Sequence, residues 1–164
     1  MEKNVTCFYI YLEPYLRQWL INQNGGNEPL DFKKGSIERE FIIQNTKRKG
    51  KDEKPDLPQK ELTAVVIHNT RGRNNYTYNR FPQRAKEELK AMLKRRFDWK
   101  MMMDILSVKN HGKLLSEMIY EWMENNGIEQ DERNYNAIVK RFQRRRVFYG
   151  LKFNVKNRKT KKKN

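Results

Sequence analysis

Residues 131 to 148 carry polar side chains that could recognise a ligand. They recur at helical spacing opposite an apolar stripe: Arg133, Asn136, Lys140, Arg141, Gln143, Arg144 and Arg145. Amide groups match adenine edges and guanidinium groups match guanine, while Lys mainly holds phosphate. We expect Arg133, Asn136 and Gln143 to approach bases. The expected phosphate contacts are Lys140, Arg141, Arg144, Arg145 and Arg146.

A second candidate binding segment covers residues 71 to 81. Three Arg and three aromatic residues are interspersed in it: Arg71, Arg73, Tyr76, Tyr78, Arg80 and Phe81. Aromatic rings stack on unpaired bases and Arg holds phosphate, an arrangement suited to a single strand. The same rings could instead pack in the core, as aromatic side chains commonly do. The three Arg are candidate backbone contacts under either interpretation.

Positive charge is concentrated toward the end of the chain. The net charge is +16, and residues 61–164 contribute +14 of it. Cations gathered in this way neutralise phosphates and release counterions, which is typical of nucleic-acid binding. Residues 154–164 are expected to form a disordered tail that adds attraction without sequence choice. Its candidate contacts are Lys156, Arg158, Lys159, Lys161, Lys162 and Lys163.

Residues suited to catalysis are scarce. Two His and one Cys exclude the usual zinc spacings, and the chain has no P-loop, dinucleotide fingerprint or nucleophile elbow. His68 ends an expected strand but lacks the clustered carboxylates that a metal nuclease needs. We expect His68 to make a structural hydrogen bond. We expect no enzyme activity, catalytic residue, metal or cofactor.

Hydrophobic periodicity predicts the elements that position these residues. Strands are expected at 5–12 and 61–68, with a short one at 29–32. Expected helices cover 14–24, 37–43, 82–97, 113–125 and 131–148. Residues 46–60 lack apolar periodicity and are expected to form an exposed loop, and 99–105 a less regular segment. The basic face of helix 82–97 could extend the binding surface or be merely solvated.

This order of elements predicts an α+β fold, with a small N-terminal β-sheet and two helices before a mainly helical C-terminal part. The expected domains are 1–70, a helical nucleic-acid-binding part at 71–153, and the basic tail at 154–164. Helices 113–125 and 131–148 predict a helix-turn-helix-like pair whose second helix enters a groove. The alternative is a plain helical hairpin with a solvated basic face.

Cys7 is the single cysteine, and no apolar stretch is long enough for a membrane span. These features predict an intracellular protein without a membrane partner. The segments 13–20 (EPYLRQWL) and 122–142 resemble small basic proteins of Bacteroides-type phages and mobile elements. The resemblance implies a bacterial cytoplasmic or nucleoid-associated setting and a role in DNA maintenance or regulation. It implies no catalytic residue.

Together these observations predict a non-enzymatic DNA-binding protein, a regulator or accessory factor of a phage or mobile element. Duplex DNA is the favoured partner. One alternative is an RNA or single-strand binder in a ribonucleoprotein, and another is a phage structural or packaging protein. A homodimer could form through residues 99–105, although apolar residues on helices usually belong to a core.

Overall fold

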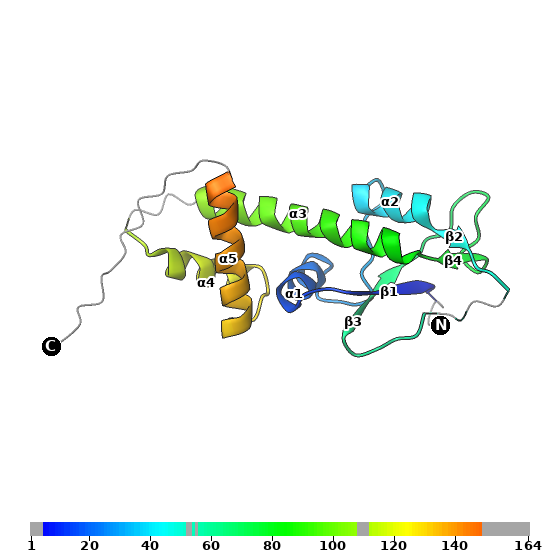
Figure 1. Cartoon of the computed structure of the whole chain (residues 1–164), viewed down its shortest axis with the longest axis horizontal. Coiled ribbons are helices and arrows are strands. Elements are labelled where there is room, and N and C mark those ends of the chain that lie inside the picture. Colours follow the sequence, from blue (N-terminus) through cyan, green and yellow to red (C-terminus); the bar gives the residue numbers. More distant parts are fainter. Residues whose placement is uncertain (1–4, 52–53, 55, 108–111, 149–164) are drawn as a thin grey trace. The chain divides into compact units, whose positions relative to one another are not determined.

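The computed structural model describes residues 5–51, 54, 56–107 and 112–148 and has the predicted α+β fold (Figure 1). Short strands and helices make up the N-terminal part, and the C-terminal part is helical. The chain divides into two compact units, residues 1–96 and 97–164. This division lies later than the predicted boundary at residue 70, because β4 and the first half of α3 belong with the N-terminal strands.

The main sheet of the first unit pairs β1 (Cys7–Tyr11) with β3 (Leu62–Val66) in antiparallel fashion, with Tyr9 opposite Ala64. Phe8 and Ile10 are buried, as expected when alternate side chains of a strand face the core. The strand predicted at 29–32 is reduced to one bridge between Leu30 and Val65. The two predicted long strands are therefore present, and the third is a single pairing.

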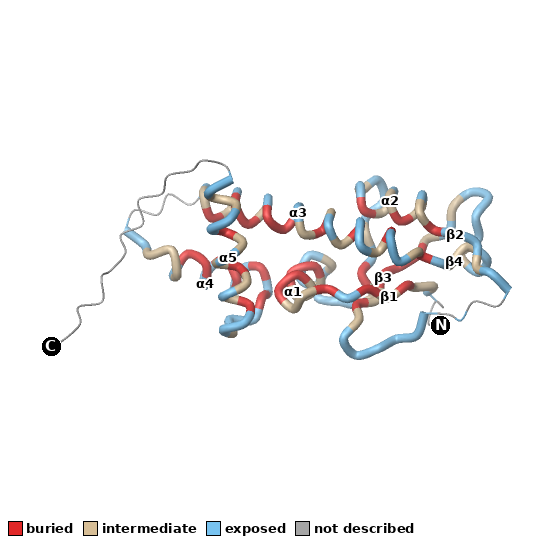
Figure 2. The backbone as a smooth tube through the Cα atoms, viewed as in Figure 1, coloured by how far each residue is buried: buried red, intermediate tan, exposed pale blue. Residues whose placement is uncertain are grey.

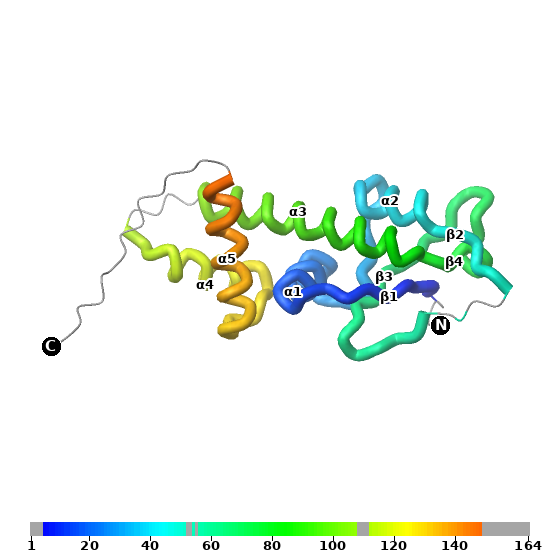
Figure 3. Tube along the Cα trace, viewed as in Figure 1, coloured from blue at the N-terminus to red at the C-terminus, as the bar shows by residue number. Residues whose placement is uncertain are grey.

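A second small sheet was missed by the sequence analysis. β2 (Lys47–Arg48) pairs antiparallel with β4 (Tyr78–Arg80), and Figure 3 shows these two segments side by side although they are far apart in the chain. Residues 46–60, expected to be loop, therefore contain the short strand β2, and residues 78–80 form its partner β4. Strands of two and three residues are too short to show a period-two pattern.

The two N-terminal helices form where the sequence predicts them. α1 (Pro14–Gln23) has Pro at its first position, where the missing N–H costs nothing, and it buries Leu16 and Trp19. α2 (Ile37–Asn45) is capped by Ser36, whose hydroxyl accepts a hydrogen bond from the Arg39 N–H at 3.2 Å.

α3 (Gln83–Ser107) is one continuous helix of 25 residues. The expectation that it ends near residue 97 and gives way to a less regular segment is wrong. Every fourth residue along one side of α3 is buried (Figure 2): Ala85, Leu89, Leu93, Phe97, Met101 and Ile105. The helix continues because residues 98–107 contain no Gly or Pro, and Met and Leu are good helix formers.

The second unit contains the end of α3, α4 (Leu115–Asn125) and α5 (Glu132–Phe148). Gly127 has φ of +66° and follows the end of α4, and the Ile128 N–H donates to the Met123 carbonyl at 2.9 Å. The Asp131 carboxylate caps α5 by accepting from the Asn134 N–H at 2.6 Å. The connection between the helices is therefore fixed at both ends.

Candidate nucleic-acid interface

The exposed side of α5 brings together five of the predicted contact residues. We call them the α5 stripe: Arg133, Asn136, Lys140, Gln143 and Arg144, all of them exposed. They fall within an arc of about 100° around the helix, opposite Ile138 and Phe142, which are fully buried. The stripe thus presents three cations and two amides on one surface. Its orientation is held by the packing of the other face.

Arg141 and Arg145 lie elsewhere on α5 and have a partner inside the protein. Nε and Nη2 of Arg141 donate to Oδ1 and Oδ2 of Asp98 in α3, at 2.6 and 2.9 Å. Nε and Nη2 of Arg145 both donate to Asp98 Oδ2, at 2.8 and 2.7 Å. The Asp98 side chain is only 5% exposed. These contacts correct the expectation that all seven polar residues share one surface. Arg146 is half-buried.

The interaction of Asp98 with two Arg was missed because its partners lie on different helices, α3 and α5. The partners are 43 and 47 residues apart in the chain. One feature of the sequence does point to a partner. Asp98 follows Phe97 on the side of α3 that faces the core, so it is a charge in a buried position. Buried charges require partners, and Arg141 and Arg145 are one helical turn apart.

α4 supports α5 and contributes acidic groups to its own exposed face. Tyr120 and Tyr135 stack between the two helices with ring centroids 4.5 Å apart. Burial, with a smaller effect from Tyr120, raises the pKa of Tyr135, so its phenol stays neutral at ordinary pH. Three acids are exposed on α4: Glu117, Glu121 and Glu124. Glu121 accepts a hydrogen bond from Lys113. This face would repel phosphate, so α5 is the helix suited to contact it.

The aromatic side chains of residues 71–81 do not share one exposed surface. Phe81 is buried and stacks on Phe8 with centroids 4.2 Å apart, so this ring belongs to the core. Tyr78 is half-buried with the Arg73 guanidinium 5.8 Å from its ring centre. Tyr76 is 71% exposed. Of the three predicted stacking residues, Tyr76 is therefore the one placed for contact with a base.

The three Arg of that segment are all exposed: Arg71, Arg73 and Arg80. Arg73 also donates to the Ile43 carbonyl at 3.2 Å, which ties the segment to the end of α2. The predicted contacts of the tail, residues 156–163, lie outside the described residues. Of the candidate contacts, the α5 stripe forms one continuous surface in the second unit, and these Arg belong to the first unit.

The basic face of α3 within the first unit is largely occupied by ion pairs. Lys94 and Lys90 lie 2.6 and 3.4 Å from Glu13 Oε1, and Arg96 lies 2.9 Å from Glu38. Burial acts to raise the pKa of Glu13, but the Lys94 hydrogen bond and the nearby cations outweigh it, so this pKa is below its ordinary value. The ion pairs on this face therefore stabilise the first unit, and they leave less of its charge available to a ligand.

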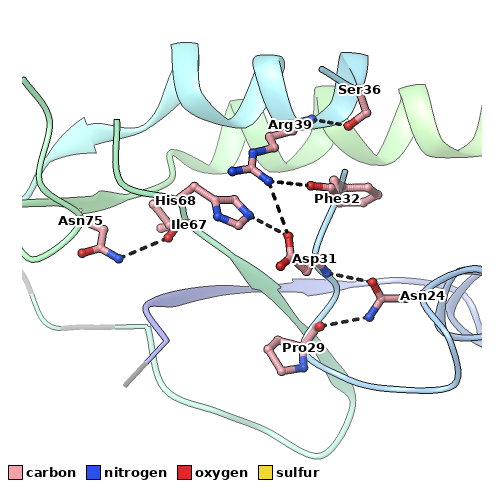
Figure 4. Close-up of polar contacts among 9 residues, drawn as sticks. All are labelled: Asn24, Pro29, Asp31, Phe32, Ser36, Arg39, Ile67, His68 and Asn75. Carbon is pink, nitrogen blue, oxygen red and sulfur yellow. Dashed lines mark hydrogen bonds and ion pairs between the residues drawn. The ribbon is translucent and has the colours of Figure 1, made fainter. Parts of the chain in front are cut away.

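His68 makes the structural hydrogen bond that the sequence analysis predicted. Its Nε2 lies 2.7 Å from Asp31 Oδ1, and Figure 4 shows the ring turned toward that carboxylate. The Asp31 N–H in turn donates to Asn24 Oδ1 at 3.1 Å. These contacts tie the end of β3 to the segment after α1.

Within the described ranges, no group of three or more His, Cys, Asp or Glu is placed to hold a metal ion. None of the helices there is both long enough and apolar enough to cross a membrane. Comparisons with protein families, with curated proteins and with solved structures found no match to this chain.

Proposed function

We propose that this chain is a non-enzymatic DNA-binding protein that contacts duplex DNA through the α5 stripe. The observation that carries the proposal is the exposed arc of Arg133, Asn136, Lys140, Gln143 and Arg144 on one well-anchored helix. Arg and Lys supply phosphate contacts and guanine recognition, and the two amides suit adenine edges. A helix fits the major groove. The acidic face of α4 would repel phosphate, which favours contact through α5.

Anchoring of the helix favours recognition over loose electrostatic attraction. The Asp98 contacts, the Asp131 cap and the Tyr120–Tyr135 stack all restrain α5 from different sides. A restrained helix presents its side chains in a fixed register, which sequence readout requires. A regulator or accessory factor of a bacterial mobile element is the setting we propose for this activity.

The test measures binding of the full chain to duplex DNA by fluorescence anisotropy at a series of salt concentrations. Lys140→Ala/Arg144→Ala should weaken binding roughly tenfold near 0.1 M salt and reduce the slope of log K against log salt by about 2, because two phosphate contacts are lost. Lys34→Ala/Arg95→Ala removes two exposed cations from the first unit and is the matched control. Equal affinities for both double variants would refute the role of α5.

Single-strand binding is the second candidate, and the exposure of Tyr76 favours it. The same assay with single-stranded DNA and RNA includes Tyr76→Ala. If stacking contributes, this variant should lose about 1–3 kcal/mol of single-strand affinity while its duplex affinity stays unchanged. Unchanged single-strand affinity would remove this candidate.

A further inference from the structure

An apolar side chain, Val147, lies among the polar side chains on the exposed side of α5. It is 75% exposed, whereas Ile138 and Phe142 of the same helix are fully buried. Single exposed apolar residues are common, so the position of Val147 is the informative feature. At 100° per residue, Val147 falls within the arc of the α5 stripe, about one turn beyond Gln143 and two turns beyond Lys140. Whatever the α5 stripe contacts therefore meets this apolar surface as well.

Four exposed side chains form a line along this surface. They follow one another at positions i, i+4, i+7 and i+11, and so share an arc of about 60°: Asn136, Lys140, Gln143 and Val147. Arg133 and Arg144, the other two residues of the α5 stripe, lie together on one side of the line. When a helix enters a groove, the middle of its inserted face meets the base edges, and the sides lie nearer the phosphates. The line therefore contains the side chains placed for the bases.

The length of the line is that of a short duplex site. The helix rises about 16 Å from Asn136 to Val147 at 1.5 Å per residue, which corresponds to roughly five base steps of 3.4 Å. Asn136 and Gln143 are about 10 Å apart along the axis, or roughly three base steps. The two amides and the apolar side chain can therefore contact different base pairs of one duplex.

The uncharged side chains of the line suit the same kind of base pair. An Asn or Gln amide can donate to N7 of adenine and accept from its N6 amino group. An apolar side chain can contact the C5 methyl group of thymine, which cytosine lacks. Asn136, Gln143 and Val147 therefore all favour an A·T pair, although they do so through different chemistry.

We propose that α5 reads A·T base pairs in the major groove, with Asn136 and Gln143 on adenine edges and Val147 on a thymine methyl group. This inference rests on the proposed function, because it names the class of duplex that the α5 stripe contacts. In this arrangement Arg133, which the sequence analysis assigned to a base, contacts phosphate from the side of the line. The site is a short duplex whose A·T pairs face the two amides and Val147.

Selection of binding sites from a random duplex pool by the full chain tests the assignment of the amides. The wild type should select A·T pairs at two positions roughly three steps apart. Asn136→Ala should lower the preference for adenine at one position roughly fivefold or more, and Gln143→Ala at the other, because each variant loses one bidentate contact. Arg133→Ala is the matched control and should weaken all sequences alike. Selection of sites without A·T pairs, or unchanged preferences in both amide variants, would overturn the proposal.

Replacement of single thymines by deoxyuridine in the selected duplex tests Val147, because this change removes only the C5 methyl group. At the thymine that faces Val147, the affinity of the wild type should fall about fourfold, the effect of one methyl group lost from an apolar contact. Val147→Ser should bind the thymine and deoxyuridine duplexes equally, within about 1.5-fold. Ile37→Ser, at a position of the first unit that is also 75% exposed, should keep the wild-type response. Equal wild-type affinity at every replaced thymine would refute the contact of Val147.

The double variant Lys140→Ala/Arg144→Ala separates this inference from the proposed function. If it weakens duplex binding while the wild type selects no A·T pairs, the contact through α5 stands and the base assignment fails. If it binds as tightly as the wild type, α5 does not contact the duplex and both proposals fail. All of the substituted side chains are exposed, so each variant should keep the fold, which circular dichroism checks.

Discussion

Asp98 is a residue of α3 that holds α5 through two Arg side chains. It accepts four hydrogen bonds from Arg141 and Arg145 while its own side chain is almost fully buried. Removing one partner from such an arrangement leaves charges without compensation, which is far more costly than losing a surface ion pair. Arg141 and Arg145 thus stabilise the fold, whereas the α5 stripe makes the proposed contact with DNA.

Asp98→Asn should lower the free energy of unfolding by about 2–4 kcal/mol, because two guanidinium groups lose their carboxylate. The expected loss is at the lower end, since the Arg141 and Arg145 side chains are 21% and 33% exposed and water screens them in part. Urea unfolding followed by circular dichroism measures it. The control is Glu124→Gln, an exposed acid on α4, which should change stability by less than about 0.5 kcal/mol. A loss below about 1 kcal/mol for Asp98→Asn would contradict this account.

At the scale of helices and strands, the sequence predicted what is encoded locally. The Ser36 and Asp131 caps and the left-handed Gly127 depend on neighbouring residues. The positions of α1, α2, α4 and α5 also agree with the expected ones, whereas α3 continues past its expected end near residue 97. β2 and β4 could not be predicted, since each is too short to show a period and depends on a distant partner.

The candidate sites divide in the same way. The spacing of the α5 stripe is visible along one helix, so its residues could be selected from sequence. The pairing of Asp98 with Arg141 depends on segments that meet only after folding. Local pattern therefore identifies a helical surface but cannot identify a long-range ion pair.

The junction between α1 and α3 should depend on pH through Glu13. Its pKa is lowered in the folded state, so the contribution of this group is present above the unfolded pKa of about 4.3 and is lost as pH falls through the folded value. Glu13→Gln should cost roughly 1 kcal/mol of stability at pH 7, because the contacts with Lys94 and Lys90 lose their charge.

The difference in stability between Glu13→Gln and the wild type should shrink to nearly zero well below pH ~4, which is close to the unfolded pKa of a Glu carboxyl. Thermal unfolding from pH 7 downward follows it, with the exposed Glu61→Gln as control. A gap that persists unchanged in acid would show that the loss comes from packing and not from charge.

At the scale of the whole molecule, the two units use their positive charge differently. In the first unit, cations of α3 form ion pairs with Glu13, Glu38 and Asp56. In the second unit, the α5 stripe is exposed, and seven more Lys and Arg follow Phe148 with no acid among them. Affinity and sequence choice should therefore come from different parts of the second unit.

Truncation of the chain after Phe148 should weaken duplex binding and flatten its salt dependence, because it removes seven cations. It should leave the preferred sequence unchanged, since side chains of the α5 stripe are the ones oriented toward bases and phosphate contacts carry no direct sequence information. Selection of binding sites from a random duplex pool, for the truncated and full chains, compares the two preferences. The counterpart is Ala137→Pro, which breaks α5 between Asn136 and Lys140 and should abolish the preference while the cations after Phe148 still attract DNA. If truncation erased the preference and Ala137→Pro preserved it, the residues after Phe148, and not the anchored helix, would have to read the sequence.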